Sequence, residues 1–571
     1  MTLCPSGTRK EVTVFRDIMT GILDRVMIAL GRREIRKMHR STAGARKKNE
    51  ELLMRILRTN KDCEYGKKYG FSDIKTAEEY RRRLPMTVFD DYQEYITRMI
   101  DGGEEGLLTS LPLVGYAQSS GSVGARKFVP LTQPEVNIYV RYTVPKMLAA
   151  TDEYLRKNRG RGLRPGRGIF TCPAFDDFLP NGLPCSNVAD VAARQLGRFY
   201  PYILVTPFKK LFNGQEADSK YMNFRLGLED RDLLFMFSIF FMNFTDLFRY
   251  LELHWETLTD DIEKGQLSGL SMASPETRKK MEKLLRPNPE RAAELRREFE
   301  KGFDKTILER IWPNLSVLYG IGSASFAPFA KIARGYTGKI PYDFSIYGAS
   351  EGLFAATDQL EDPKQLLLVD SCYYEFIPEE EPDRILSLDE LEEGREYEIV
   401  ITNQSGLYRY RCGDVIRVVG YMNECPYVQF SYRKGQLLNM TGEKTTEEHM
   451  AAVVKEISRI SGCNVTDWAV SHGLDSHPYR YMLLLENPEG RDLSGYSAQA
   501  TEILKKVNPR FEVFFNEAEL GPMTIHNLEY GTQLAWRDLR VSKGTAVTQY
   551  KPVRILDTPE KQEFFLSRIK N

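Results

Sequence analysis

Short β-rich runs alternate with long helical stretches between about residues 110 and 405, and this alternation restricts the chain to few architectures. The β-rich runs occupy residues 168–170, 315–319, 344–347, 366–369, 373–377 and 397–402. Helical periodicity covers the stretches between them, most clearly at 231–264 and 274–302. Strands that alternate with helices in this way form a sheet that is buried beneath the helices. The pattern therefore predicts an α/β domain.

A second, smaller unit follows a polar break at Arg433-Lys434-Gly435. Three further β-rich runs precede the break, at 407–411, 415–421 and 427–432. After it the pattern predicts a helix, two strands, a helix and a strand, at 447–460, 465–470, 479–485, 496–507 and 511–515. Because 571 residues exceed what one hydrophobic core usually serves, we expect a large domain at 1–432 and a small α+β domain at 433–571.

The N-terminal region and the longest apolar run both predict helices. Residues 11–58 carry apolar side chains at three- and four-residue spacing between basic clusters, which favours a helical arm with a solvated charged face over a membrane-surface helix. The run at 233–244 is too short to cross a bilayer and predicts a buried core helix. We therefore expect no secretory signal and no membrane span.

Charge and cysteine usage exclude several classes of protein. Lys+Arg and Asp+Glu both total 79, whereas a nucleic-acid binder normally carries a basic excess. The eight cysteines are scattered, without the spacing of a zinc site or a disulfide framework. Free thiols are typical of a reducing compartment. We expect a cytoplasmic protein with no nucleic-acid partner.

The first chemical motif is a loop rich in serine and glycine at 119–127 (SSGSVGARK). It follows an apolar stretch and precedes a helical one. Glycines let backbone N–H groups converge on an anion, and a lysine adds a full positive charge. The loop suits the phosphates of ATP, although a surface turn of this composition is the alternative. The candidate ligands are Ser119, Ser120, Gly121, Ser122, Gly124 and Lys127.

The second motif is Ser345-Ile346-Tyr347-Gly348-Ala349-Ser350-Glu351-Gly352. The flat face of Tyr347 can stack on a purine, and the carboxylate of Glu351 can hold Mg²⁺ through a hard oxygen ligand. The alternative is a core tyrosine beside a solvated glutamate.

The third motif, at 406–414 (GLYRYRCGD), ends in a carboxylate that can accept hydrogen bonds from the two hydroxyls of a ribose. A common Gly-Asp turn is the alternative for Asp414. Two later loops, at 438–445 and 548–554, each carry a lysine that could reach phosphate, Lys444 and Lys551.

Read in order, these motifs resemble those of the adenylate-forming enzyme superfamily, and more closely the Gretchen Hagen (auxin-responsive promoter) family of acyl-acid amido synthetases. The matching stretches include SSGSVGARKFVP, IWPNLSVLYGIGSAS, SIYGASEG, GLYRYRCGDVIRVVGY, VQFSYRKGQLLNMTGEKT and TQYKPVR. They run from about Ser119 to Arg554 and so cover most of the chain.

The resemblance implies a large N-terminal domain with β-sheets and surrounding helices, a small mobile C-terminal domain, and an ATP site between them. It assigns phosphate contacts to the first loop, adenine to Tyr347, Mg²⁺ or phosphate to Glu351 within the Ser350–Glu351 pair, and ribose to Asp414. Arg433 falls at the family's hinge. By this resemblance, Lys127, Lys444 and Lys551 would stabilise charge while a small carboxylic acid is activated as its acyl-adenylate and joined to an amine, which we expect to be an amino acid.

One position departs from the family pattern, and several functions stay open. Val123 stands where the family usually has a hydroxyl residue, so the resemblance implies that one phosphate contact is absent. No motif marks the pocket for the acid or the amine. The alternatives are an acyl-CoA ligase that uses the same adenylation, a ligand-binding homologue without turnover, and an interaction protein that docks through its helical N-terminus.

Overall fold

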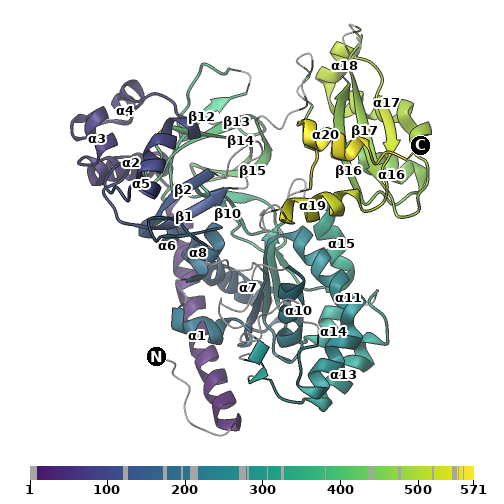
Figure 1. Ribbon diagram of the computed structural model, residues 1–571. Helices are drawn as coiled ribbons and strands as arrows, with labels where there is room; N and C mark the ends of the chain where they lie inside the picture. The colour runs from purple at the N-terminus through teal and green to yellow at the C-terminus, as the bar shows by residue number, and fades with distance from the viewer. Residues whose placement is uncertain are drawn as a thin grey trace. The chain divides into compact units, whose positions relative to one another are not determined.

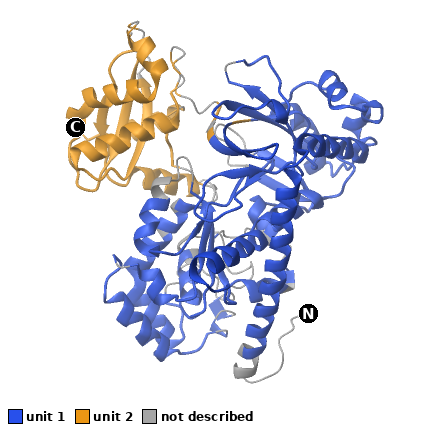
Figure 2. Ribbon diagram, turned by 180° about the vertical axis from the view of Figure 1, so that it is seen from behind, with its two compact units in different colours: residues 1–119, 126–412, 416–430 blue, residues 120–125, 413–415, 431–571 orange. Residues whose placement is uncertain are grey.

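The computed structural model divides into two compact units (Figure 2). Unit 1 comprises residues 1–119, 126–412 and 416–430, and unit 2 comprises 120–125, 413–415 and 431–571. The structure describes residues 9–119, 127–171, 177–194, 197–205, 216–268, 278–279, 282–283, 285–304, 306–322, 327–379, 381–434, 438, 440, 443, 445–473, 478–516, 518, 520–542, 550, 552–556 and 558–570.

Within these residues, three sheets form the centre of unit 1 (Figure 1). Their orders are β2-β1-β5-β4, β3-β6-β7-β8 and β12-β13-β14-β15-β11-β10-β9. The strands are β1 (Leu113–Ser119), β2 (Lys127–Thr132), β3 (Gly168–Phe170), β4 (Asp177–Phe178), β5 (Pro184–Ser186), β6 (Phe235–Phe240), β7 (Val317–Ile321), β8 (Tyr342–Asp343), β9 (Ile346–Ala349), β10 (Gly352–Ala356), β11 (Gln365–Leu367), β12 (Tyr373–Pro378), β13 (Glu396–Thr402), β14 (Tyr410–Met422) and β15 (Cys425–Arg433).

Helices surround these sheets. They are α1 (Arg9–Ser41), α2 (Ala45–Asn60), α3 (Glu64–Tyr69), α4 (Ala77–Arg83), α5 (Gln93–Asp101), α6 (Gln133–Tyr142), α7 (Val144–Arg159), α8 (Val188–Arg194), α9 (Tyr200–Ile203), α10 (Glu216–Gly227), α11 (Phe241–Lys264), α13 (Pro289–Phe299), α14 (Ile307–Ile311) and α15 (Ala327–Thr337). The predicted helical arm at 11–58 is thus two helices, separated by a turn before Gly44, whose φ of 68° favours glycine.

The prediction of a core helix at 233–244 is wrong in its first half, because residues 235–240 form the strand β6. Both neighbours of β6 run parallel to it. Met236 packs with the helices α10, α11 and α15, whereas Phe235 and Phe237 pack on the opposite side with α1 and α7. A strand that is buried on both faces is apolar at every position, so its sequence has no alternation that distinguishes it from a buried helix.

Unit 2 is a three-stranded sheet with helices packed on it, which gives it the predicted α+β character. Its elements are α16 (Glu447–Ser461), β16 (Asp467–Gly473), β17 (Arg480–Glu486), α17 (Ser497–Val507), α18 (Pro509–Asn516), β18 (Thr524–Asn527), α19 (Thr532–Ser542) and α20 (Pro559–Leu566). The strand β17 pairs with β16 antiparallel and with β18 parallel.

The predicted strand at 511–515 is wrong, since α18 occupies this segment. Asn508 precedes the helix, and its Oδ1 accepts hydrogen bonds from the backbone N–H groups of Arg510 and Phe511, at 3.1 and 3.3 Å. A side chain that satisfies free N–H groups in this way, followed by a proline at the first helical position, favours a helix start. The domain bounds 1–432 and 433–571 stay a prediction.

Among the described residues, no helix is long and apolar enough to cross a membrane.

Candidate active site

The first motif lies in a hairpin rather than between a strand and a helix. The strands β1 and β2 pair antiparallel, and Ser119 lies opposite Lys127 at the open end of the pair. The ammonium group of Lys127 lies 5.0 Å from the centre of the Phe89 ring. The predicted phosphate ligands Ser120, Gly121, Ser122 and Gly124, together with Val123, lie outside the described residues. The hairpin places Ser119 and Lys127 at the two bases of the loop that the sequence predicts to bind phosphate.

The second motif forms the tight connection between β9 and β10, with Ser350 and Glu351 in the turn. Glu351 is buried. The following Gly352 is required by close packing, because a Cβ there would lie 2.9 Å from the Sγ of Cys372 and 3.0 Å from the Phe354 ring. The turn that carries Glu351 is therefore held in place by close contact of its backbone at Gly352 with Cys372 and Phe354.

A buried ion pair anchors the start of this motif. The Nζ of Lys146, on α7, lies 3.0 and 2.9 Å from the two carboxylate oxygens of Asp343 and donates to Thr357 Oγ1 at 2.7 Å. The backbone N–H of Ser345 donates to Asp343 Oδ1 at 2.9 Å. Ser345 has a φ of 71°, which is unfavourable for a residue with a side chain. These contacts hold the strained residue in place and so fix where the motif begins.

Tyr347 packs in the core of unit 1. Only 7% of its surface is exposed. Its ring contacts Phe354 edge-on at 5.2 Å between centroids and Phe430 at 5.8 Å. In this structure its packing is that of the core tyrosine which the sequence left as the alternative, and its role as an adenine partner stays a prediction.

Hydrogen bonds within unit 1 join the second motif to the start of the third. The amide nitrogen of Asn403 donates to the carbonyl oxygen of Glu351 at 2.7 Å, and its Oδ1 accepts from the N–H groups of Ser405 and Leu407. The hydroxyl of Tyr410 donates to Glu351 Oε1 at 3.3 Å. Asn403 and Tyr410 thus tie the second motif to the third.

The hairpin of the first motif joins the same network. The backbone N–H of Thr132, at the end of β2, donates to Ser405 Oγ at 3.1 Å, and the Thr132 hydroxyl donates to the carbonyl of Gln404 at 3.2 Å. Thr132 and Ser405 are both fully buried. The segments that carry Lys127, Glu351 and Tyr410 are therefore held together by buried hydrogen bonds.

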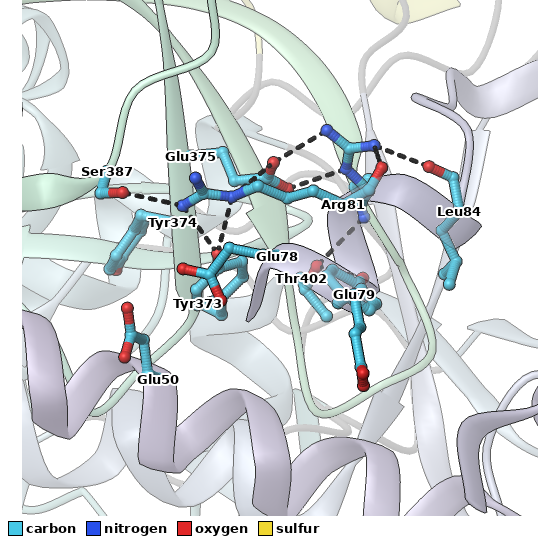
Figure 3. Close-up of polar contacts among 12 residues, drawn as sticks. Glu50, Glu78, Glu79, Arg81, Leu84, Tyr373, Tyr374, Glu375, Ser387 and Thr402 are labelled. Atoms are coloured by element: carbon cyan, nitrogen blue, oxygen red, sulfur yellow. Dashed lines mark hydrogen bonds and ion pairs between the residues drawn. The ribbon is translucent and has the colours of Figure 1, made fainter. Parts of the chain in front are cut away.

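A buried Arg409–Glu375 pair, with the partly buried Arg81 beside it, holds the third motif (Figure 3). Glu375, on β12, accepts hydrogen bonds from Nε and Nη2 of Arg409 at 3.0 and 2.8 Å, and Arg81 Nε lies 3.5 Å from the same carboxylate. Arg409 Nη1 also donates to the carbonyls of Arg81 and Leu84. Arg409 has a φ of 47°, an unfavourable conformation that these contacts stabilise.

The last residue of the third motif is paired within unit 2. Arg433 Nε donates to Asp414 Oδ1 at 2.5 Å, and Asp414 is almost fully buried. The predicted ribose ligand and the predicted hinge residue are thus in direct contact. The predicted phosphate-contacting lysines of the small domain, Lys444 and Lys551, lie outside the described residues.

A buried carboxyl group lies directly behind the second motif. Glu135, on α6, is buried, and a Cβ on Gly352 would lie 3.5 Å from its Oε1. Burial raises the pKa of Glu135 to about 8. Glu135 is therefore largely neutral at pH 7, which avoids a second negative charge near Glu351.

No local sequence signal pointed to five residues that hold the motifs: Lys146, Asp343, Asn403, Glu375 and Glu135. Lys146 meets Asp343 across 197 residues, and Asn403 meets Glu351 across 52. No motif spacing reports such pairs. Of the residues that hold the motifs, Arg409 and Tyr410 lie inside a predicted motif.

A magnesium ion at Glu351 would need oxygen ligands beyond the protein. Among the described residues, no three His, Cys, Asp or Glu side chains gather as a metal cage. Mg²⁺ is commonly held by one or two carboxylates together with substrate phosphates and waters. A single buried carboxylate, with the remaining ligands supplied by substrate phosphates and waters, fits that mode of binding.

Comparison with known proteins identifies the family. The GH3 family N-terminal domain model matches residues 34–342, the GH3 family central domain matches 365–433, and the GH3 family C-terminal domain matches 447–560. Among curated proteins, the indole-3-acetic acid-amido synthetase GH3.8 of Oryza sativa subsp. indica is 29% identical, over 91% of this chain and 90% of that protein. The jasmonoyl--L-amino acid synthetase GH3.5 of Oryza sativa subsp. japonica is 28% identical, over 90% and 93%.

Solved structures show the same fold. AtGH3.15 acyl acid amido synthetase in complex with 2,4-DB superposes with a TM-score of 0.81 at 22% identity, over 94% of this chain and 95% of that one. A 2-hydroxyisobutyryl-CoA ligase in the postadenylation state superposes with a TM-score of 0.50 at 12% identity, over 95% and 92%. The predicted fold class, that of an adenylate-forming enzyme, is confirmed. With its N-terminal model alone matching more than half of the sequence, the chain belongs to the GH3 family, as the motifs predicted.

Proposed function

We propose that this protein is an ATP-dependent acyl-acid amido synthetase. It activates a small carboxylic acid as its acyl-adenylate and transfers the acyl group to an amine, which we propose is an amino acid. The observation that carries the proposal is the buried hydrogen-bond network through Asn403, Tyr410 and Thr132, which holds together within unit 1 the segments that carry Lys127, Glu351 and the start of the third motif. The activities named for the GH3 relatives support amide formation rather than thioester formation. We also propose a cytoplasmic location.

The reaction needs positive charge and oriented donors, because a carboxylate must attack the α-phosphorus of an anionic triphosphate. Lys127 and the N–H groups of the 119–127 loop would stabilise the charge that develops on the phosphate oxygens. Asp414 would hold the ribose hydroxyls, and Tyr347 the adenine. Glu351 would ligate Mg²⁺, which when bound neutralises phosphate charge. Pyrophosphate leaves, and the amine attacks the acyl carbonyl to release AMP.

The small domain would change its position between the two half-reactions. We propose that residues 433–571 turn about Arg433 and supply Lys444 and Lys551 to the phosphates during adenylation. Closure of such a domain excludes the water that would hydrolyse the acyl-adenylate. The lysines act as electrostatic stabilisers and form no covalent bond.

The experiment that tests the function is acid-dependent exchange of pyrophosphate into ATP across a panel of carboxylic acids. Mass spectrometry of products formed with mixed amino acids or with coenzyme A then identifies the acceptor. Exchange without any amide product would refute amide formation, and the absence of exchange with every acid would refute adenylation.

The variant Asp414→Ala tests the ribose assignment. We expect loss of pyrophosphate exchange and a raised KM for ATP, since the ribose hydroxyls lose their acceptor and Arg433 loses its partner. Arg433→Met is the matched control, because it breaks the same ion pair but keeps the carboxylate. Exchange at the parent rate in Asp414→Ala would show that this residue does not bind the nucleotide.

A further inference from the structure

A face of unit 1 that takes no part in the proposed reaction combines an exposed apolar stripe with a basic groove. We propose that this face docks the protein on the surface of a membrane that contains anionic phospholipids. The proposal concerns a peripheral contact, and it does not depend on the proposed enzymatic activity.

The apolar stripe lies on α1, the long helix drawn in purple along one side of unit 1 (Figure 1). It consists of six side chains with 42–56% of their surface exposed: Val14, Phe15, Ile18, Ile22, Val26 and Leu30. The opposite face of the helix is already used, because Met27 and Ile35 are buried against α7. At 1.5 Å per residue the stripe is roughly 24 Å long. A contiguous exposed apolar surface of this kind marks an interaction site.

The basic groove lies beside the C-terminal half of α1, between α1, α2 and α6, and has a volume of about 910 Å³. Two acidic side chains line it, Glu51 and Asp370. Six cationic side chains line it: Arg33, Lys37, Arg40, Lys48, Arg55 and Arg141. The local excess of positive charge contrasts with the net charge of zero over the whole chain.

Half of these cations are already engaged inside the protein. Lys37 pairs with Asp370 at 2.5 Å, Arg141 lies 3.5 Å from Glu34, and Lys48 donates to the carbonyls of Arg40 and Ala43.

The other three cations are free. In the part of the chain that the structure describes, the guanidinium groups of Arg33, Arg40 and Arg55 make no hydrogen bond or ion pair. Arginine presents a planar fork of donors that matches the oxygens of a phosphate group. Three such forks around one hollow provide a site for phosphate headgroups.

The stripe and the groove share one side of α1. The residues 14, 18, 22, 26, 30, 33, 37 and 40 follow one another at intervals of three or four, which keeps them on one face of a helix. This row is apolar up to Leu30 and basic from Arg33 onwards, and it contains no acidic residue. A helix that lies in a membrane interface buries an apolar face among the acyl chains while its basic residues contact the phosphates.

The combination favours a membrane over two simpler ligands. A soluble phosphate compound would use the groove but would leave the apolar stripe without a function. A second copy of the chain would cover the stripe but would bring the same unpaired arginines against one another. An anionic lipid surface offers acyl chains to the first half of α1 and phosphates to the second.

The test is co-sedimentation of the full-length protein with phosphatidylcholine vesicles that contain or lack phosphatidylserine. We expect binding to the vesicles with phosphatidylserine, weakening with added salt because the attraction is screened. R33Q/R40Q/R55Q should bind about 100-fold more weakly, at about fivefold per arginine near the lipid surface. R33K/R40K/R55K, which keeps the charge, should retain most of the binding.

Matched controls carry the same change of chemistry elsewhere on unit 1. R82Q/R297Q/K364Q removes three exposed cations outside the groove and should bind like the parent. I18Q/I22Q should bind roughly tenfold more weakly, whereas L253Q/I332Q, at exposed apolar positions on α11 and α15, should not. Far-UV circular dichroism and the thermal midpoint of each variant establish that it is folded.

Four results would overturn the proposal. The first is no binding to vesicles that contain phosphatidylserine, and the second is equal binding to vesicles of phosphatidylcholine alone. The third is that the control variants lose as much binding as the variants of the stripe and groove. The fourth is that I18Q/I22Q still binds vesicles and the groove captures soluble glycerophosphoserine. Light scattering without lipid tests whether the parent forms a dimer. If the parent is a dimer, I18Q/I22Q is a monomer and neither binds vesicles, the stripe contacts a second copy of the chain.

Discussion

The buried Arg409–Glu375 pair allows a quantitative prediction for Glu375→Gln. Glu375 accepts two hydrogen bonds from Arg409 and lies 3.5 Å from Arg81, and the side chains of Glu375 and Arg409 are 1% and 4% exposed. The substitution leaves the Arg409 guanidinium buried without a counter-charge and turns an amide NH₂ toward it. Removing one partner of a buried ion pair costs about 3–5 kcal/mol. We expect the free energy of unfolding of unit 1 to fall by that amount.

The assay is equilibrium unfolding in urea, read from tryptophan fluorescence and circular dichroism. Glu381→Gln is the matched control, because Glu381 also faces two arginines, Arg384 and Arg395, but on the exposed surface. Exposed ion pairs contribute little, so the control should unfold like the parent. Arg409→Met completes a double-mutant cycle with Glu375→Gln, and the coupling isolates the pair from other contacts of either residue.

A functional consequence should accompany the loss of stability. Arg409 holds a left-handed backbone conformation in the middle of the third motif. Without Glu375 the segment loses the contact that offsets this strain, and we expect a raised KM for ATP under conditions in which the variant is still folded. A variant that unfolds like the control, or that shows no coupling between the two residues, would refute the view that this pair holds the motif.

Three further predictions follow from the same network. Burial raises the pKa of Glu135 from 4.5 to about 8, so the contribution of its neutral carboxyl to stability is fully present below pH 4.5 and is lost as the pH rises to 8. The free energy of unfolding of Glu135→Gln should not fall in this way, and its excess over that of the parent should grow by about 4–5 kcal/mol between pH 4.5 and 8. Parallel pH profiles of the two proteins would contradict this prediction. Tyr410→Phe should lower the rate of pyrophosphate exchange by roughly two- to tenfold, since Glu351 loses one neutral hydrogen-bond donor, and an unchanged rate and KM would remove Tyr410 from the site. Lys146→Met leaves Asp343 buried without its counter-charge and should lower the free energy of unfolding by about 3–5 kcal/mol, a loss that Asp343→Asn in the same chain should partly reverse if the pair is the cause.

The sequence predicted the elements whose local signals are unambiguous. The helix α16 at Glu447–Ser461 was expected at 447–460, and the side chain of Thr446 accepts a hydrogen bond from His449 N–H at its start. The strand β3 occupies the predicted residues. The predictions failed where the local pattern is ambiguous: β6 is apolar on both faces, and the start of α18 depends on Asn508, a residue outside the predicted segment.

The candidate site divides in a similar way. Motif order singled out Glu351 and Lys127 as candidates, because glycine-rich loops with a charged residue are local features of the chain, and their roles stay predictions. It did not predict the hairpin in which Lys127 lies. The residues that hold them could not be found, since Lys146 and Asn403 act through partners that folding alone brings near. The exposed stripe on α1 was also missed, because apolar residues at helical spacing read as a packing face until the structure shows which side is covered.

The hydrogen bonds of Asn403 also set a limit on how the enzyme can diversify. The Asn403 side-chain amide bridges the second and third motifs: its NH₂ group donates to the carbonyl of Glu351, and its oxygen accepts from the N–H groups of Ser405 and Leu407. An aspartate of the same shape has no donor for the Glu351 carbonyl, and a glutamine is one carbon too long. The short Asn403 side chain therefore constrains the spacing between the two loops, together with the Tyr410–Glu351 hydrogen bond. A change of acid or amine has to be accommodated by segments that these two bonds do not touch.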